Sequence, residues 1–337
     1  MALGSKLVQN LGMGERMKGI FFSSMIIFLI TCLFIFFSIQ RSMLSFYSSQ
    51  RAIENRVEAM IKFYESVVYD SRKSMEITAQ RATCSAINYV VTTGSPLQSS
   101  NETIAELILQ GTINSEPQGL MEASTVKDWE DSIEYLGTLQ GFRTSVDIRD
   151  LLIEPEDSYH LSISYTIFVE LYDDNIKTNL TKNSREKIIM SIENMEDPLY
   201  PLNTLGRIVN IIRPSPHWLN YSSEDTSNLK DDLENSYYHP SLYGASFLDR
   251  LEGKFFVQEK YFKPNPIGLE SFVNKDKILS AGLPIDAYAT NIDYLYFSKS
   301  GVDAYSISGM PSNFRLDNET SLEGKTHLQI YNVTVIE

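Results

Sequence analysis

The side chains best suited to metal binding or acid–base catalysis are few and widely spaced in this sequence. No two of its four histidines form a His-x-x-x-His or similar pair: they are His160, His217, His239 and His327. Because zinc ligands commonly recur at short intervals, we interpret each histidine as a surface or strand residue rather than as a metal ligand.

Two cysteines are too few for a disulfide scaffold. Cys32 lies inside a long apolar run and Cys84 lies far beyond it, so the two cannot pair with each other. We interpret Cys84 as a packed residue of a helix, with a reactive thiol or an intermolecular bridge as the alternative.

Acidic residues cluster at Asp173-Asp174 and at Asp231-Asp232-Glu234. Neither cluster has the order of oxygen ligands around a central glycine that a calcium loop requires, so we interpret both as solvated faces. The segment Gly244–Leu248 lacks the second glycine of a nucleophile elbow, and no glycine-rich phosphate motif occurs. The sequence therefore predicts no catalytic residue, no metal site and no cofactor. A hydrolase of glycans or peptides stays an alternative, since the many carboxylates leave open which two would converge.

Any such residues must be positioned by the helices and strands of the chain, and the distribution of glycine and proline along its 337 residues indicates where these differ. No glycine or proline lies between Gly19 and Gly94, whereas all 12 prolines follow Gly94. The formal net charge is −14, and no basic face is visible, which argues against a nucleic-acid partner. This distribution indicates a long helix followed by a folded domain.

The run from Ile20 to Ile39 carries no charge and reads as a transmembrane helix. At 1.5 Å per residue it spans about 30 Å, the thickness of a bilayer core. Its polar members are small enough to bond to carbonyl groups of the same helix: Ser23, Ser24, Thr31, Cys32 and Ser38. The lipid bilayer is thus a predicted partner.

The charges that flank this run predict its orientation. Lys6, Arg16 and Lys18 precede it and are opposed only by Glu15, so the amino terminus is expected in the cytoplasm and everything after Arg41 outside. A cleaved secretory signal is disfavoured because no small-x-small site follows the apolar run. No second long apolar run exists, so we expect a single crossing.

Beyond the bilayer, apolar residues recur at intervals of three, four and seven, which is typical of one helical face. This stripe comprises Phe46, Ile53, Val57, Met60, Tyr64, Val67, Met75 and Ala82. Two interpretations stay open. The stripe packs either against the chain's own outer domain or against neighbouring copies as a coiled coil or filament core.

The string Glu15-Arg16-Met17-Lys18-Gly19, followed by Ile20-Phe21-Phe22-Ser23, resembles the start of an archaeal type IV pilin-like precursor. In that superfamily a basic leader ends in Lys/Arg-Gly, and a long apolar helix then carries a globular head. The resemblance implies cleavage after Gly19 by a prepilin-type peptidase, with Lys18, Gly19 and Ile20 as processing residues. It also implies other pilin-like subunits as partners.

The resemblance has one departure and one extension. Ser24 stands where many bacterial pilins carry a glutamate, so the usual docking contact to a neighbour's amino terminus is not implied, and the large head favours a minor, tip or pseudopilin-like role. The strings Glu196–Tyr200, Ser246–Gly253 and Ile267–Val273 resemble uncharacterised archaeal membrane-anchored surface proteins. No activity comes with that likeness.

The outer domain is predicted to be α+β, with a mainly antiparallel sheet. Asn101–Ile113 and Thr125–Leu139 read as helices, the second capped by Thr125. The clearest strand is His160–Tyr172, where apolar residues alternate with mostly polar ones. Weaker strands are expected at Lys187–Ile192, Arg207–Ile212, Phe255–Phe262, Ile292–Phe297 and Leu328–Ile336.

Two surface features of this domain could serve recognition or modification. The polar stretch Pro214–Pro240 reads either as an ordinary long loop or as a contact loop built on Trp218, Tyr221, Tyr237 and Tyr238. Five Asn-x-Ser/Thr sequences are candidate glycosylation sites: Asn101, Asn179, Asn220, Asn318 and Asn332.

The sequence thus predicts a cytoplasmic leader (1–19), a transmembrane helix (20–39), a helical stalk (40–93) and an extracellular α+β head (94–337). The expected function is that of a pilin-like or pseudopilin-like structural and interaction protein at the cell membrane. The alternatives are the membrane-tethered hydrolase and a non-pilin, signal-anchored adhesin.

Overall fold

The computed structural model describes the backbone of residues 5–336 and the side chains of residues 22–336. The chain divides into two compact units, Met1–Phe63 and Tyr64–Glu337, which we call the N-terminal unit and the head unit. One continuous helix, α1 (Ser5–Thr93), makes up the described part of the first unit and provides the first element of the second. The helix ends at Thr93, and the next residue, Gly94, has a left-handed φ of +64°.

The head unit is α+β with antiparallel sheets, as the sequence predicts. Its longest sheet has the order β3-β4-β5 and is formed by Arg143–Asp157, His160–Asp173 and Thr178–Ser191. The remaining strands form pairs or a three-stranded sheet: β1 (Thr112–Ile113), β2 (Glu116–Pro117), β6 (Tyr238–Ser246), β7 (Gly268–Ser271), β8 (Ala304–Ile307), β9 (Arg315–Asp317), β10 (Thr320–Leu322), β11 (Lys325–Thr326) and β12 (Val335–Ile336).

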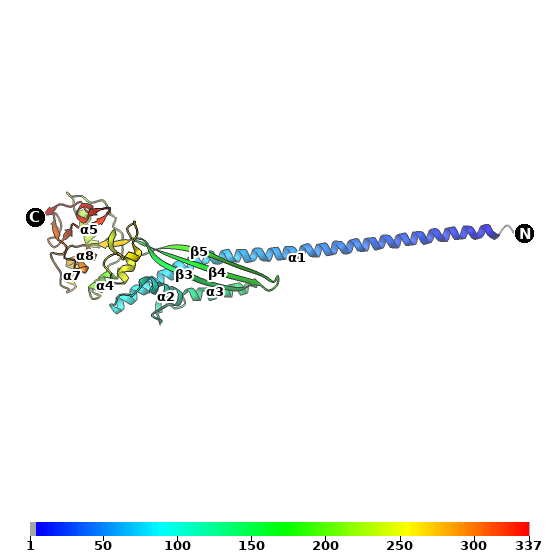
Figure 1. Cartoon of the computed structure of the whole chain (residues 1–337), viewed down its shortest axis with the longest axis horizontal. Helices are drawn as coiled ribbons and strands as arrows, with labels where there is room; N and C mark the ends of the chain where they lie inside the picture. Colours follow the sequence, from blue (N-terminus) through cyan, green and yellow to red (C-terminus); the bar gives the residue numbers. More distant parts are fainter. Residues whose placement is uncertain (1–4, 337) are drawn as a thin grey trace. The chain divides into compact units, whose positions relative to one another are not determined.

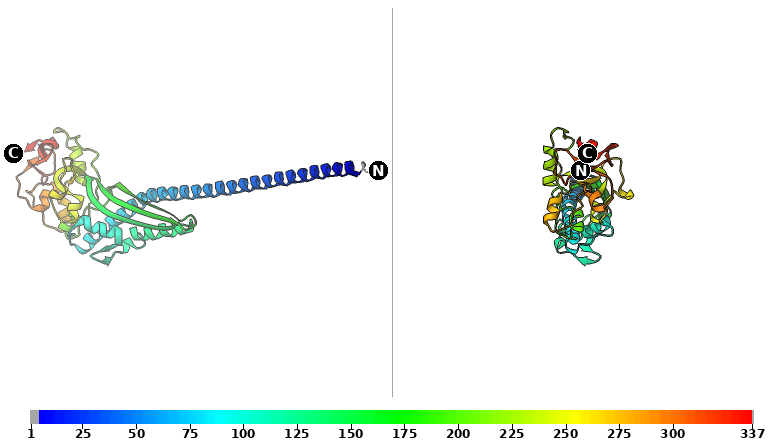
Figure 2. Two further views of the ribbon diagram at one scale, coloured as in Figure 1. Left: turned by 45° about the vertical axis from the view of Figure 1, so that its right-hand side comes forward. Right: turned by 90° about the vertical axis from the view of Figure 1, so that its left-hand side faces the viewer.

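Short helices connect and cover these sheets. They are α2 (Ser100–Gln110), α3 (Val126–Leu139), α4 (Leu199–Asn203), α5 (Ser227–Asn235), α6 (Phe247–Leu251), α7 (Lys275–Ser280), α8 (Asp293–Ser298) and α9 (His327–Ile330), with 3-10 turns at Gly119–Met121 and Glu259–Tyr261. Figures 1 and 2 show the long sheet at one end of the head unit, with α2 and α3 alongside, and the smaller elements gathered at the other end.

Strand β4 forms the spine of the long sheet because its alternate residues are apolar. The six predicted inward positions are all buried: Leu161, Ile163, Tyr165, Ile167, Val169 and Leu171. Burying each such side chain contributes about 1.5–3 kcal/mol. The predicted strand is thereby confirmed.

The first edge of this sheet is covered by helix α3. The cap that the sequence predicts at Thr125 is present, since its hydroxyl accepts from the backbone N–H of Asp128 at 3.1 Å, and the Asp128 carboxylate accepts from the Thr125 backbone N–H in return, which completes a capping box. Glu130 of α3 then accepts from the backbone N–H of Ile148 in β3 at 3.0 Å. A buried carboxylate thus satisfies an edge group that would otherwise lack a partner.

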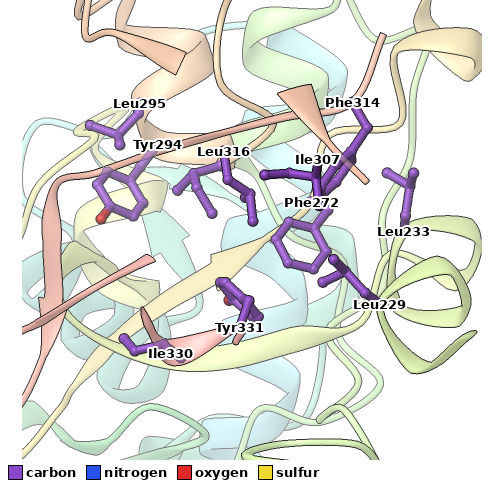
Figure 3. Close-up of a cluster of buried hydrophobic side chains, with 11 residues drawn as sticks. Leu229, Leu233, Phe272, Tyr294, Leu295, Ile307, Phe314, Leu316, Ile330 and Tyr331 are labelled. Carbon is purple, nitrogen blue, oxygen red and sulfur yellow. The ribbon is translucent and has the colours of Figure 1, made fainter. Parts of the chain in front are cut away.

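A second core lies at the opposite end of the head unit. Figure 3 shows how rings from distant segments meet there, with Phe272, Phe314 and Tyr331 at the centre. Phe272 contacts both other rings, with centroids 5.5 and 4.9 Å apart. This core holds β8, β9, α5, α8 and α9 together.

Several weaker strand predictions are wrong. Ile292–Phe297 is mostly helix α8, and Leu328–Ile336 begins in α9 and reaches a strand only at Val335. Arg207–Ile212 contains only an isolated bridge, and Phe255–Phe262 contains an isolated bridge and the 3-10 turn Glu259–Tyr261. The strand predicted at Lys187–Ile192 is confirmed, since it forms the end of the longer strand β5. Short apolar runs fit a buried helix as well as a strand, and here the tertiary contacts decided between them.

Candidate functional site

The predicted processing residues Lys18, Gly19 and Ile20 lie in α1, and their side chains lie outside the described residues. From Phe22 to Ile39 every side chain is exposed, and Phe34, for example, is 73% accessible. Thr31 donates its hydroxyl to the carbonyl of Ile27 at 2.8 Å, as the sequence predicts for the small polar members of this run.

By length and composition, α1 is the one helix in the described part of the chain that could cross a membrane. Its exposed apolar surface continues past Ile39 through Met43, Leu44, Phe46 and Tyr47. The serines between them bond back to the helix, since Ser45 donates to Ser42 O and Ser48 to Ser45 O. Exposed apolar side chains thus recur on α1 beyond the polar residues Gln40 and Arg41.

The apolar stripe of α1 changes its environment along the helix. Phe46 and Ile53 in the N-terminal unit are exposed, whereas Val67, Met75 and Ala82 in the head unit are buried. In the head unit the helix also bonds to the long sheet: Ser71 Oγ lies 3.1 Å from Tyr165 Oη, and Arg72 Nε lies 2.5 Å from Glu186 Oε2. The end of the stripe thus packs against the chain's own domain.

The four aromatic residues of the predicted contact loop differ in burial. Trp218 stacks on His239 with 5.1 Å between ring centroids, and Tyr221 donates to Asp232 at 2.5 Å. Tyr238 is fully buried in β6 and donates to Asp197 at 2.8 Å, while Tyr237 is half-buried. The stretch also contains helix α5. Trp218 and Tyr221 therefore pack against the second core, and Tyr238 is fully buried.

The five candidate glycosylation sites differ in accessibility. Asn179, Asn220, Asn318 and Asn332 are exposed. Asn101 is half-buried in the first turn of α2, and its side-chain oxygen accepts from Ser99 Oγ at 3.0 Å.

Two histidines that the sequence treats as isolated meet in a buried network. His327 Nδ1 lies 2.5 Å from Asp317 Oδ1, and its Nε2 lies 3.1 Å from Glu270 Oε2. Both neighbours are carboxylates, so both ring nitrogens carry a proton and the ring is an imidazolium. Burial alone lowers the pKa of His327, but Glu270 and Asp317 outweigh burial and raise it to about 10.

The network continues from Glu270 to His239. Tyr331 donates to Glu270 and lies 3.1 Å from His239 Nδ1, which is therefore the donor in that contact. His239 Nε2 lies 3.0 Å from Asp232 Oδ2. Burial raises the pKa of Asp232, but the bonds from His239, Tyr221 and Ser215 outweigh it and hold that pKa low. His239 lies in β6 and is a strand residue, as interpreted, whereas His327 lies in α9 and is fully buried, so the interpretation as a surface or strand residue is corrected for His327.

A second buried network surrounds Arg250, which the sequence did not single out. Its Nη1 donates to Asp197 at 2.5 Å and to Asp293 at 2.8 Å, and its Nη2 donates to the carbonyl of Leu269. Burial lowers the pKa of Arg250, but the two aspartates raise it above its ordinary value. Arg250 therefore stays charged and joins α6 to β7 and α8.

Other assignments from the sequence also need correction. Asp173 and Asp232 are fully buried rather than solvated, while Asp174 pairs with Arg143 at 2.8 Å. Cys84 is exposed rather than packed. Among the residues that the structure describes, no group of three or more His, Cys, Asp or Glu side chains could hold a metal ion.

The carboxylates of these networks are buried and hydrogen-bonded within the head unit. The carboxylates of Glu270, Asp317 and Asp232 are fully buried, and each already accepts hydrogen bonds. The exposed apolar segment of α1 is the feature that calls for a partner. Comparison of the chain with known protein families, curated proteins and solved structures found no match.

Proposed function

We propose that this chain is a single-pass, membrane-anchored cell-surface protein of the type IV pilin-like class. The observation that carries the proposal is the exposed apolar segment Phe22–Ile39 within the continuous helix α1. This surface is unfavourable in water, because moving each large apolar side chain from water into an apolar environment is favourable by about 1.5–3 kcal/mol. A lipid bilayer, or the apolar core of an assembly, would cover it.

The charges around α1 support the proposed orientation. Lys6, Arg16 and Lys18 favour a cytoplasmic amino terminus, which places the head outside. Processing after Gly19 would leave Ile20 as the mature terminus. The helix would then serve as anchor and as assembly element, and the head would serve recognition.

Mass spectrometry of the protein purified from its native membrane tests the proposal. A mature chain that begins at Ile20 and stays in the membrane after alkaline carbonate extraction is the expected result. A chain that begins at Met1 would exclude processing, and release into the soluble fraction would exclude the anchor.

Crosslinking distinguishes this proposal from the alternative of a signal-anchored adhesin that uses α1 only as a stalk. With Cys32 and Cys84 changed to serine, single cysteines at Phe46 and Ile53, both exposed, would crosslink copies of a pilin-like assembly. A stalk would give no such product.

The buried carboxylates of the head give the hydrolase alternative no support.

A further inference from the structure

The apolar run of α1 is followed by two helical turns that carry almost no charge. Between Ile20 and Gln50 the only charged residue is Arg41, whereas four charged residues follow between positions 51 and 58. At 1.5 Å per residue the segment from Ile20 to Gln50 is about 46 Å long. The hydrocarbon core of a bilayer is about 30 Å thick, and the bilayer with both headgroup layers is about 40–45 Å thick. The segment therefore matches the whole bilayer rather than its core alone.

The side chains of these two turns differ around the helix axis. The apolar ones are all more than half exposed and share one side: Met43, Leu44, Phe46 and Tyr47. The opposite side is polar and comprises Arg41, Ser42, Ser45 and Ser48. Because an α-helix turns by about 100° per residue, the apolar side covers about 160° of the circumference. That is wider than the narrow seam that a single partner helix covers, so a lipid surface fits it better than one neighbouring helix does.

The polar side can leave bulk water at low cost. Ser45 donates its hydroxyl to Ser42 O and Ser48 donates to Ser45 O, both at 2.9 Å, so these hydroxyl protons have acceptors within the helix. The acidic residue of α1 that is nearest to Arg41 is Glu54, 13 positions along the chain. On a helix that separation is about 20 Å, too long for an ion pair. The Arg41 guanidinium therefore suits an anion from outside the helix, and its planar fork matches a phosphate.

Phe46 and Tyr47 end the apolar side. Their rings meet edge to face, with centroids 6.3 Å apart. A helix centred in the bilayer on Ile35 would place Tyr47 about 18 Å from the midplane, just outside the hydrocarbon core. Aromatic rings are enriched at this depth. Arg41 would lie about 9 Å from the midplane, from which its long side chain reaches outwards to the headgroups.

We propose that Arg41, Phe46 and Tyr47 form an outer interfacial anchor of α1, in which the Arg41 guanidinium binds lipid phosphate and both rings lie in the headgroup layer. This inference rests on the proposed membrane anchor. It places the boundary with water near Arg51 rather than at Ile39. The competing occupant of the apolar side is a second copy of α1.

Spin labelling of the full chain in phosphatidylcholine liposomes measures the depth of single positions. With Cys32 and Cys84 changed to serine, the label is attached to Phe34→Cys, Leu44→Cys or Ile53→Cys, three positions that are exposed. Power saturation compares collisions with O₂, which concentrates in lipid, and with a nickel chelate, which stays in water. We expect O₂ to dominate at position 34, the nickel chelate to dominate at position 53, and an intermediate ratio at position 44.

Two outcomes at position 44 would overturn the proposal. Nickel collisions as frequent as at position 53 would place these turns in water. Few collisions with either reagent would show that a second copy of the helix covers them. Nickel collisions at position 34 would instead contradict the membrane anchor itself, so failure of this inference and failure of the proposed function are distinguishable.

The role of Arg41 is tested in the chain labelled at position 44. Arg41→Leu removes the group that binds phosphate, so we expect the helix to sink and the label to move deeper by less than one helical turn of about 5.4 Å. Arg51→Leu removes the same charge beyond the headgroup layer and should leave the depth unchanged. No shift in Arg41→Leu, or equal shifts in both variants, would overturn the assignment of Arg41.

Discussion

Tyr331 donates its phenolic proton to Glu270 over 2.5 Å, and neither side chain is more than 1% exposed. The same oxygen lies 3.1 Å from His239 Nδ1, so one tyrosine joins the His327 half of the buried network to the His239 half. Charged groups this deep stabilise a fold only when every partner is present. The network therefore fixes how α9, β7 and β6 meet.

Replacing His327 by glutamine should remove the cation between Asp317 and Glu270. At pH 6 we expect a loss of about 3–5 kcal/mol in the free energy of unfolding, because two buried carboxylates lose their counter-charge. The folded pKa of His327, about 10, exceeds the ordinary 6.5. Its contribution is therefore complete below pH 6.5 and is lost as the pH rises through 10.

Urea unfolding at several pH values measures both effects. The wild-type protein should lose stability between pH 6.5 and 10 more steeply than His327→Gln. The control is His160→Gln, since His160 is half-exposed beside Asp157 and should cost less than about 1 kcal/mol. Parallel pH profiles for the wild type and His327→Gln would contradict the role assigned to His327.

Replacing Arg250 by methionine should cost about 3–5 kcal/mol, because Asp197 and Asp293 would stay buried without their cation. Arg250→Lys should recover only part of this, since lysine lacks the planar fork that donates to both aspartates and to Leu269 O. Arg185→Met, at an exposed position of β5, is the control. Equal unfolding midpoints for Arg250→Met and Arg185→Met would show that the network contributes nothing.

Local patterns in the sequence predicted the parts of the fold that depend on neighbours along the chain. The alternation in β4, the cap at Thr125 and the end of α1 at Thr93 are of this kind. Strand β3 was missed because Arg143, Asp147 and Arg149 interrupt its apolar alternation. The charged side chains lie on the more exposed face of β3, and the apolar residues alternate only on its buried face.

The buried networks could not be predicted from spacing. His239 of β6 and His327 of α9 meet through Glu270 of β7 and Tyr331, so the network joins three separate segments of the chain. Composition nevertheless held a signal. The chain is rich in carboxylates, and a folded core that buries several of them must supply cations, which Arg250 and His327 provide.

Glycosylation, if the head is exported as proposed, should be selective. We expect glycans at Asn220 and Asn318, which are exposed, and none at Asn101, which is half-buried in a helix and bonded to Ser99. Peptide mapping by mass spectrometry measures the occupancy of each site. A glycan on Asn101, or none on both Asn220 and Asn318, would contradict this expectation.

Lys275 is a buried cation whose effect on stability should change with pH in the direction opposite to that of His327. Its Nζ donates to Ala289 O at 2.6 Å and to Asn313 O at 3.0 Å, and among the described residues it has no ion-pair partner. Burial lowers its pKa from 10.5 to about 8, with a further lowering by Arg315. Burying the charge therefore costs free energy below pH 8, and that cost is relieved as the pH rises towards 10.5.

The variant Lys275→Met removes this titration. We expect the stability of the wild type relative to Lys275→Met to rise by about 2–3 kcal/mol between pH 7.5 and 10.5, as measured by urea unfolding. Tyrosines that titrate in the same range cancel in the difference. Lys230→Met, at an exposed position of α5, should show no such trend. A difference between the wild type and Lys275→Met that stays constant with pH would mean that the ammonium is as well solvated in the fold as in the unfolded chain.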